Sequence, residues 1–429
     1  MQKVGSGRNV PTNSFYCSVM SQTFPNLSKY FVDKKGILCI FSSIMKKPVY
    51  LDNAATTAVA PEVVSEMLPY FTKIYANPLT RAYSTMGYKA AQALDKAREQ
   101  VASLIGAQPE EIYFTSGGSE ADNWALKGIA WANRHRGNHI IISAIEHKAV
   151  LRSAEFLKRE GFTVTVIKVD SAGLVNIEEI KRAITDKTTL VSIMHANNEI
   201  GTIQPIKEIA DVCHSRGVLF HTDIVQSVPH MAVDIKSIDA DLAGMAAHKF
   251  YGPKGVGALY IKKGIEITPL IHAGGQEGGL RGSTHNMPGI IGIGAAAAVL
   301  KQKLADDNKK VNALTDKLKN EILAKIPDAE INGSQDNRIA GNLNFTFKNA
   351  PAENILLMLN HEGIIAAGGS ACNAESGGMS HVLTALGKKT TSDFGGLRLS
   401  VGRFNTEEEI DYVLGTLPGI IEKIRGLSN

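Results

Sequence analysis

One lysine of this 429-residue chain stands where an amine could do chemistry. Lys249 follows an apolar run and His248, and it precedes a turn bounded by glycine and proline. A lysine at the edge of a core can lose its proton and form a Schiff base with a carbonyl compound. A lysine seen in isolation is more often an exposed residue whose stem covers apolar surface. Other parts of the chain must therefore decide between the two interpretations.

Polar groups of four further kinds follow other predicted strands. Residues 116–119, Ser-Gly-Gly-Ser, open a predicted helix whose N–H groups and dipole favour a phosphate, although a simple helix cap has the same pattern. They form neither a dinucleotide-binding nor a P-loop motif. His147 is a candidate general base or a ring that stacks on a flat ligand, and equally a capping or surface histidine. Residues 197–199, Asn-Asn-Glu, offer amides, although such clusters commonly form turns. Asp223, with Gln226 close behind it, is an acid at a buried strand end and needs a cationic partner.

Taken together, five strand ends offer a phosphate cradle, an imidazole, an amide, a carboxylate and an amine. Ligands of open α/β sheets bind at the carboxyl ends of the strands, so these groups are expected to face one site. An aldehyde cofactor with a phosphate and a pyridine ring requires this combination. The combination therefore favours the Schiff-base interpretation of Lys249.

The elements that must position these groups alternate along the chain. Short apolar runs predict strands, and segments with helical periodicity between them predict crossover helices, which indicates an α/β fold with a mostly parallel sheet flanked by helices. A long helix is expected over 290–326, interrupted near 306–308, and a smaller α+β domain follows it. The predicted strands are 112–114, 139–144, 162–169, 189–194, 218–221 and 241–245 in the first part, and 343–347, 363–366 and 397–401 in the second.

Composition excludes several classes of protein. Hydrophobic residues make up 44% and charged residues 21%, as in ordinary globular proteins, and no apolar run is long enough to cross a membrane. The net charge of +4 is carried by residues 1–44, so the remainder has no excess charge and no basic stripe for nucleic acid. Four scattered cysteines lack metal-binding spacing and favour a reducing compartment, which predicts a cytoplasmic protein without a metal site.

Residues 1–44 are serine-rich and weakly patterned, unlike the sequence that follows. They are consistent with an organelle transit peptide, which would place the protein in a mitochondrion or related organelle, or with a signal sequence. We favour a third interpretation, an extension that the fold does not use, because ordered patterning begins only near residue 46.

The chain resembles the cysteine desulfurases of the NifS/IscS type, within the class V pyridoxal-phosphate-dependent aminotransferases. The resemblance spans about residues 48–426. It is carried by YLDNAATT (50–57), FTSGGSEADN (114–123), EHKAV (146–150), VSIMHANNEIG (191–201), HTDIVQS (221–227), HKFYGPKGVGALY (248–260), GGSAC (368–372) and LRLSVGRFNTEEEIDY (397–412).

The resemblance implies the fold type I architecture of pyridoxal-phosphate enzymes, with a mostly parallel seven-stranded sheet. It also implies four regions: the extension at 1–44, an N-terminal arm at 45–60 that packs with the small domain, a large cofactor-binding domain at 61–300, and a small C-terminal domain at 301–429 that carries the catalytic cysteine loop. The loop is long, as in IscS-like rather than SufS-like members.

The resemblance also implies residue roles. Lys249 would hold pyridoxal 5'-phosphate, with His147 as proton shuttle and Cys372 as the sulfur-accepting nucleophile that meets an iron–sulfur cluster only in transit. The clamp for the substrate carboxylate would be Asn198, which also belongs to the cofactor site, and Arg398. The remaining cofactor contacts would come from Gly118, Ser119, Asp223 at the ring nitrogen, Gln226 at the ring hydroxyl, His248, and Thr284 of the neighbouring subunit.

The expected activity is removal of sulfur from L-cysteine, giving L-alanine and a persulfide on Cys372. The expected partners are L-cysteine, a second copy in a homodimer, and an iron–sulfur scaffold protein or other sulfur acceptor; neither nucleic acid nor membrane is expected. Selenocysteine lyase, another class V aminotransferase or lyase, and a non-catalytic binding homologue remain alternatives. Two positions depart from the family pattern: Ala246 stands where a serine usually contacts the phosphate, and Ile224 follows the aspartate where a small residue is usual.

Overall fold

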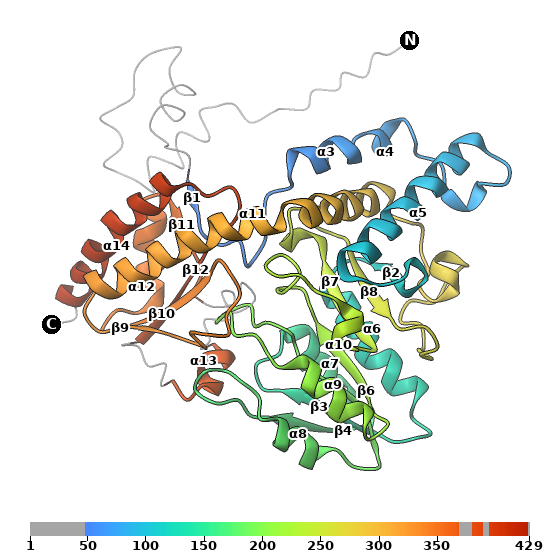
Figure 1. Cartoon of the computed structure of the whole chain (residues 1–429), viewed down its shortest axis with the longest axis horizontal. Coiled ribbons are helices and arrows are strands. Elements are labelled where there is room, and N and C mark those ends of the chain that lie inside the picture. The colour runs from blue at the N-terminus through green and yellow to red at the C-terminus, as the bar shows by residue number, and fades with distance from the viewer. Residues whose placement is uncertain (1–47, 369–379, 389–393, 428–429) are drawn as a thin grey trace, which may run out of the picture. The chain divides into compact units, whose positions relative to one another are not determined.

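The computed structural model describes residues 48–368, 380–388 and 394–427. Its elements are shown in Figure 1 and keep the labels used there. The helices are α3 (Pro61–Met67), α4 (Pro69–Thr72), α5 (Thr85–Ile105), α6 (Gly118–Ala132), α7 (Lys148–Arg159), α8 (Ile177–Ala183), α9 (Ile206–His214), α10 (Ile235–Ile238), α11 (Met287–Lys325), α12 (Ala352–His361), α13 (His381–Ala385) and α14 (Glu407–Leu427), with short 3-10 turns at η2 (Pro78–Thr80), η3 (Pro109–Glu111), η4 (Ala247–Lys249) and η5 (Gln276–Gly279). The strands are β1 (Val49–Tyr50), β2 (Ile112–Thr115), β3 (His139–Ser143), β4 (Thr163–Ile167), β5 (Thr188–Ser192), β6 (Leu219–Asp223), β7 (Leu242–Ala246), β8 (Gly257–Ile261), β9 (Ala329–Ile331), β10 (Asn342–Lys348), β11 (Ile364–Ile365) and β12 (Phe394–Ser400).

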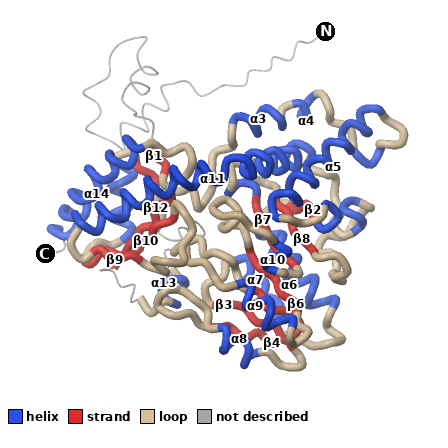
Figure 2. Tube along the Cα trace, viewed as in Figure 1, coloured by secondary structure: helices blue, strands red, loops and turns tan. Residues whose placement is uncertain are grey.

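A seven-stranded sheet in the order β2-β8-β7-β6-β5-β3-β4 forms the centre of the fold (Figure 2). Neighbouring strands from β7 through β4 are parallel, whereas β8 is antiparallel to both β7 and β2. Because β8 is antiparallel to both of its neighbours, β2 runs in the same direction as β7 and the other parallel strands. The α/β class and the mostly parallel sheet are thus confirmed, and β8 is a strand that the sequence analysis missed.

Helices cover both faces of this sheet because its central strands are apolar on both sides. All five residues of β3 are buried, and they alternate between two cores. Ile140 and Ile142 pack with α6 and α7, whereas Ile141 packs with the core that contains α5, α9 and the first half of α11. Strands that are buried on both faces read as continuous β-branched runs, which is the pattern seen here.

The helix α11 differs from its prediction. We expected an interruption near residues 306–308, but the helix is continuous from Met287 to Lys325. No glycine or proline lies there, and each polar residue lowers helix stability by less than about 1 kcal/mol. Asn308 Nδ2 donates to His230 O at 2.7 Å, and Arg403 pairs with Asp307, so tertiary contacts hold this stretch. The prediction of a break was wrong because polar residues between two cores resemble a helix end.

A second core packs on the C-terminal half of α11 (Figure 1). It contains the three-stranded antiparallel sheet β12-β10-β9 and the helices α12 and α14. Val49 and Leu51 belong to this core, and β1 pairs with β11 through Val49 and Ile364. These contacts support a small C-terminal domain that receives the N-terminal arm. The domain boundaries at 60 and 300 stay a prediction, since α11 spans both cores.

Residues 1–47 lie outside the described residues, so the three interpretations of 1–44 stay open. In the part of the chain that the structure describes, no helix has the length and apolar character needed to span a membrane.

Candidate active site

The strands β2, β3, β5, β6 and β7 end at one edge of the large sheet, and each is followed by one of the polar groups expected from the sequence. Of the parallel strands, only β4, the last strand in the sheet order, is not followed by one of these groups. Parallel strands deliver their following loops to the same side, which explains how residues more than a hundred positions apart converge.

Lys249 ends the short turn that follows β7, a strand whose five residues are all buried. Its Nζ donates hydrogen bonds to the carbonyl oxygens of Ala54, at 2.6 Å, and Ala55, at 2.8 Å. Gln226 Nε2 donates to the same Ala54 oxygen at 2.9 Å. The N-terminal arm therefore crosses the site and joins the lysine to the glutamine. Sequence reasoning missed this contact, and its only signal was the stretch at 50–57.

Asp223 ends β6 with only 5% of its surface exposed. Its Oδ1 accepts the Val225 N–H at 2.8 Å. Burial raises the pKa of Asp223 to about 6, while that hydrogen bond and the charge of Lys249 hold it down. Two more buried carboxyls lie close by: burial raises the pKa of Glu146 to about 8 and that of Asp122 well above its usual value. The Val225 N–H and the charge of Lys249 favour the ionised form of Asp223, whereas burial favours its protonated form.

His147 caps the N-terminus of α7, where its Nδ1 accepts the Ala149 N–H at 3.2 Å. Burial, followed by the charge of Lys249, lowers the pKa of His147 to about 4. The ring is therefore neutral at pH 7 with its proton on Nε2. Burial and then the charge of Lys249 lower the pKa of His248 to about 4 as well, and its Nδ1 lies 3.2 Å from Thr56 Oγ1. Since Lys249 perturbs Asp223, His147 and His248 alike, the fold brings all four together.

The Ser116–Ser119 turn leads into α6, which begins at Gly118 without a side-chain cap among the described residues. A Cβ on Gly118 would lie 2.9 Å from Val225 Cγ2, so the turn approaches its neighbours closely enough to require glycine. The same Cβ would lie 3.5 Å from the Cβ of Ala246. Ala246 thus faces the helix N-terminus, where a negatively charged group is favoured.

Asn198 and Arg398 are brought together as expected. Arg398 is 1% exposed, and its Nη1 donates to the backbone oxygen of Asn198 at 3.0 Å. Its Nη2 donates to Asp52 Oδ1 of the N-terminal arm at 2.6 Å. Asp52 was not assigned a role from the sequence, although it lies in the quoted stretch at 50–57.

Cys372 lies outside the described residues, but the residues that flank 369–379 are attached at the strand-end site. Before it, Ala367 and Arg398 exchange two backbone hydrogen bonds, at 2.6 and 3.2 Å. After it, Ser380 Oγ donates to Glu199 Oε2 at 2.5 Å, and His381 Nε2 lies 3.0 Å from the backbone oxygen of Glu146. The chain therefore enters and leaves this segment beside the groups that converge on Lys249.

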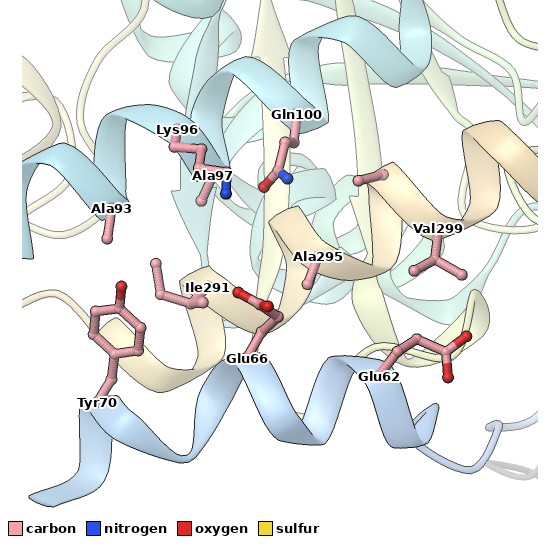
Figure 3. A pocket seen from close by; sticks show the side chains of 11 residues that line it. Glu62, Glu66, Tyr70, Ala93, Lys96, Ala97, Gln100, Ile291, Ala295 and Val299 are labelled. Carbon is pink, nitrogen blue, oxygen red and sulfur yellow. The ribbon is translucent and has the colours of Figure 1, made fainter.

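Two hollows accompany this group of side chains. One, of about 200 Å³, lies at the Ser116 turn and has both Ser116 and Thr284 in its lining. The other, of about 250 Å³, lies between α3, α5 and α11, where Glu66, Lys96 and Ile291 line it (Figure 3). The second hollow contains none of the strand-end residues, so the chemistry is not placed there.

Comparison with known proteins adds the decisive observation. The family model described as aminotransferase class-V matches residues 49–413, which includes every described residue of the site. The chain belongs to the class-V aminotransferase family. Its relatives within that family include cysteine desulfurase IscS of Clostridium botulinum (strain Hall), 51% identical over 90% of this chain and 97% of the relative. Cysteine desulfurase IscS of Methanosarcina thermophila is 48% identical over 90% and 95%.

Solved structures of the family agree with these relatives. A NifS-like protein is 38% identical, with a TM-score of 0.82 over 88% of this chain and all of that chain. A structure described as SspA in complex with cysteine is 36% identical, with a TM-score of 0.73 over 83% and 100%. The resemblance to the NifS/IscS-type cysteine desulfurases is confirmed, and with it the fold class and the assignment of the chain as an enzyme of that class V group.

Proposed function

We propose that this protein is a cysteine desulfurase that uses pyridoxal 5'-phosphate to remove sulfur from L-cysteine, releasing L-alanine and leaving the sulfur on Cys372. The observation that carries the proposal is the buried Asp223 carboxyl beside the amine of Lys249, whose charge favours the ionised carboxyl, at the ends of parallel strands. A buried acid and a partly buried amine are costly to bring together at one site, and a pyridine nitrogen and an aldehyde are the groups that they would bind.

The residues present fit this cofactor. Gln226 Oε1 is buried and has no hydrogen-bond partner within the described part of the chain, so it can accept from a ring hydroxyl. The Gly118–Ser119 turn offers backbone N–H groups at the N-terminus of a 15-residue helix, which suits a phosphate. Lys249, Asp223, His147, His248 and Asn198 would complete the site, with Thr284 supplied by the neighbouring subunit. When bound, the cofactor supplies an electron sink for bonds at the substrate α-carbon.

The side chains would then act on protons and on substrate. Neutral His147 holds a proton on Nε2, and Lys249 is the nearby amine that can accept or return one. Arg398 and Asn198 would hold the substrate carboxylate, because a buried guanidinium binds a carboxylate through two parallel hydrogen bonds. The Cys372 thiolate would take the sulfur. A sulfur–sulfur bond forms as the carbon–sulfur bond of the substrate breaks. The electron pair of the broken bond stays on the substrate carbon, which takes up a proton to give alanine.

Partners and location belong to the same proposal. The persulfide would pass to an iron–sulfur scaffold protein or another sulfur acceptor, and the enzyme would act as a homodimer. A cytoplasmic location is supported by the scattered cysteines of the sequence.

The proposal is tested by measuring sulfide and alanine release from L-cysteine in the presence of a thiol reductant. Wild type, Lys249→Ala and Cys372→Ala are compared. We expect Lys249→Ala to lose the visible absorbance of lysine-bound cofactor together with both products, and Cys372→Ala to keep that absorbance but lose both products. Undiminished alanine release by Cys372→Ala would contradict the proposed role of the cysteine. A wild-type protein that stays colourless with added cofactor would contradict the enzyme itself.

A further inference from the structure

The glycine-rich segment, residues 274–286, is held against the large sheet by a buried carboxylate. The side chain of Glu277 is 2% exposed. Its two oxygens accept hydrogen bonds from the guanidinium of Arg98, at 2.7 and 2.8 Å, from the backbone N–H of Phe114 at 2.9 Å, and lie 2.9 Å from His285 Nε2. One side chain thus ties both ends of the segment to α5 and β2.

The geometry at Glu277 is costly to maintain. Its backbone has φ 47°, in the left-handed region that non-glycine residues seldom occupy. Burial alone would raise the pKa of its carboxyl, yet the hydrogen bonds from Arg98 and His285 outweigh burial and lower the pKa to about 2. A buried carboxylate with so many donors holds its position firmly, so the segment has one preferred placement.

A second carboxylate fastens the same segment to the phosphate turn. Glu120 Oε2 accepts the Ser116 N–H at 2.7 Å. Arg281 forms two hydrogen bonds with the same carboxylate, from Nε at 2.8 Å and from Nη2 at 3.1 Å. Glu120 therefore bridges the turn before α6 and the glycine-rich segment.

Thr284 lies between these two attachments. Arg281, three residues before it, is held by Glu120, and His285, directly after it, is held by Glu277. Ser283, the preceding residue, is itself in a left-handed conformation at φ 94°. The backbone at Thr284 is thus constrained from both sides, at the wall of the hollow that includes Ser116.

We propose that Glu277 is a positioning residue for cofactor binding, which sets Thr284 for the cofactor phosphate of the neighbouring subunit. The proposal rests on the proposed function, because the phosphate is that of pyridoxal 5'-phosphate. Glu120 shares this role on its own side, where it links the segment to the phosphate turn of its own subunit. Loss of the Glu277 carboxylate therefore lowers the cofactor affinity of the other subunit's site.

The first test measures the affinity of the cofactor-free protein for pyridoxal 5'-phosphate, and the absorbance of the bound cofactor monitors binding. Glu277→Gln turns an acceptor toward Arg98 into a donor, and we expect affinity to fall about tenfold through the weaker hold on Thr284. Glu330→Gln, which removes the same charge from an exposed pair with Lys388, is the matched control and leaves affinity unchanged. Where Glu277→Gln does not fold, Arg98→Lys keeps the charge, loses the fork and gives the same direction.

A double-mutant cycle separates positioning from general damage. In a Thr284→Ala background, Glu277→Gln has no further effect on cofactor affinity if it acts through Thr284. Two losses that simply multiply would overturn the proposal. In that case the proposed function still stands, since it is judged separately by the Lys249 and Cys372 variants.

Mixed dimers show which subunit is affected. When Lys249→Ala and Glu277→Gln are carried by the same subunit, the intact lysine lies in the subunit whose phosphate receives Thr284 from the altered one, and its cofactor affinity falls about tenfold. When the two changes are on different subunits, the intact lysine is served by an unaltered Thr284, and affinity matches wild type. The reverse pattern, with the loss only on separate subunits, would overturn the proposal.

Discussion

Arg398 Nη2 lies 2.6 Å from Asp52 Oδ1, which joins β12 of the small core to the N-terminal arm. The guanidinium is buried, whereas 17% of the Asp52 side chain is exposed. Arg398 Nη1 donates to the Asn198 backbone oxygen, and Arg398 Nε has no partner among the described residues. The arginine is thus oriented from two sides before substrate arrives. A substrate carboxylate would meet a fixed donor group rather than a mobile side chain.

This orientation predicts the effect of Arg398→Lys. A lysine keeps the charge but not the planar fork, so we expect KM for L-cysteine to rise at least about tenfold with little change in kcat. The measurement is steady-state alanine release at varied cysteine concentration. Arg425→Lys on α14, where the guanidinium donates to the backbone oxygens of Lys348 and Pro327 at the surface, is the matched control. A fall in kcat at unchanged KM would show that Arg398 does not bind the ground-state carboxylate.

The alanine that faces the phosphate turn predicts a gain. Ala246 is 2% exposed and lies beside Gly118, so a serine there would add a hydroxyl donor next to the expected phosphate. We expect Ala246→Ser to tighten pyridoxal 5'-phosphate affinity about tenfold, measured by cofactor titration of the cofactor-free protein. Ala243→Ser, on the same strand but in the apolar core, should give no gain and a less stable protein. Equal affinity in Ala246→Ser and wild type would mean that the turn does not hold the phosphate.

The sequence revealed the strand-end groups because each lies directly after a short apolar run, and a parallel sheet converts that order into proximity. Lys249 and Asp223 could be found this way. The Ala54 and Ala55 carbonyls could not, since a backbone acceptor has no sequence signal and the arm reaches the site only through β1 and β11. Asp122 lies in the quoted stretch 114–123 and was given no role, and its burial beside Asp223 follows from the packing of α6.

Local pattern also failed where tertiary contacts decide. Residues 257–260 were quoted as part of a motif and not as a strand, although they belong to β8, which lies between β7 and β2. The polar residues at 306–308 suggested a helix break, but a core on either side carries α11 through them. Cys372 was placed by resemblance, and it lies outside the described residues.

Ser380 directly follows residues 369–379. Its contacts predict that a change there affects sulfur transfer but not cofactor binding. Its hydroxyl donates to the buried Glu199 carboxylate at 2.5 Å and accepts the Leu383 N–H at the start of α13. Ser380→Ala leaves that carboxylate oxygen unsatisfied, which lowers the free energy of unfolding by about 1–3 kcal/mol. We expect kcat for sulfide release to fall several-fold while cofactor affinity stays unchanged. Ser215→Ala, whose exposed hydroxyl donates only to Val212 O, is the control, and equal effects of both variants on kcat would contradict the prediction.

His221 predicts how stability changes with pH. The ring is fully buried, with Nδ1 2.8 Å from Ser192 Oγ, and burial lowers its pKa from 6.5 to about 3. As pH falls below about 6.5 the unfolded chain takes up a proton that the folded chain refuses, so the contribution of neutral His221 is complete above that pH. It then declines by up to about 1.4 kcal/mol per pH unit until the folded pKa is reached.

Replacing His221 should therefore flatten the acid side of the stability profile. We expect the free energy of unfolding of His221→Asn, measured by urea titration at about pH 7, 6 and 5 with saturating cofactor, to decline less steeply than that of wild type, by about one proton's slope. His135→Asn, at an exposed position, serves as the control and should keep the wild-type slope. Parallel profiles for wild type and His221→Asn would mean that the buried ring takes up its proton in the folded state as readily as in the unfolded chain. The contact of His221 with Ser192 would then make a contribution to the free energy of unfolding that does not depend on pH.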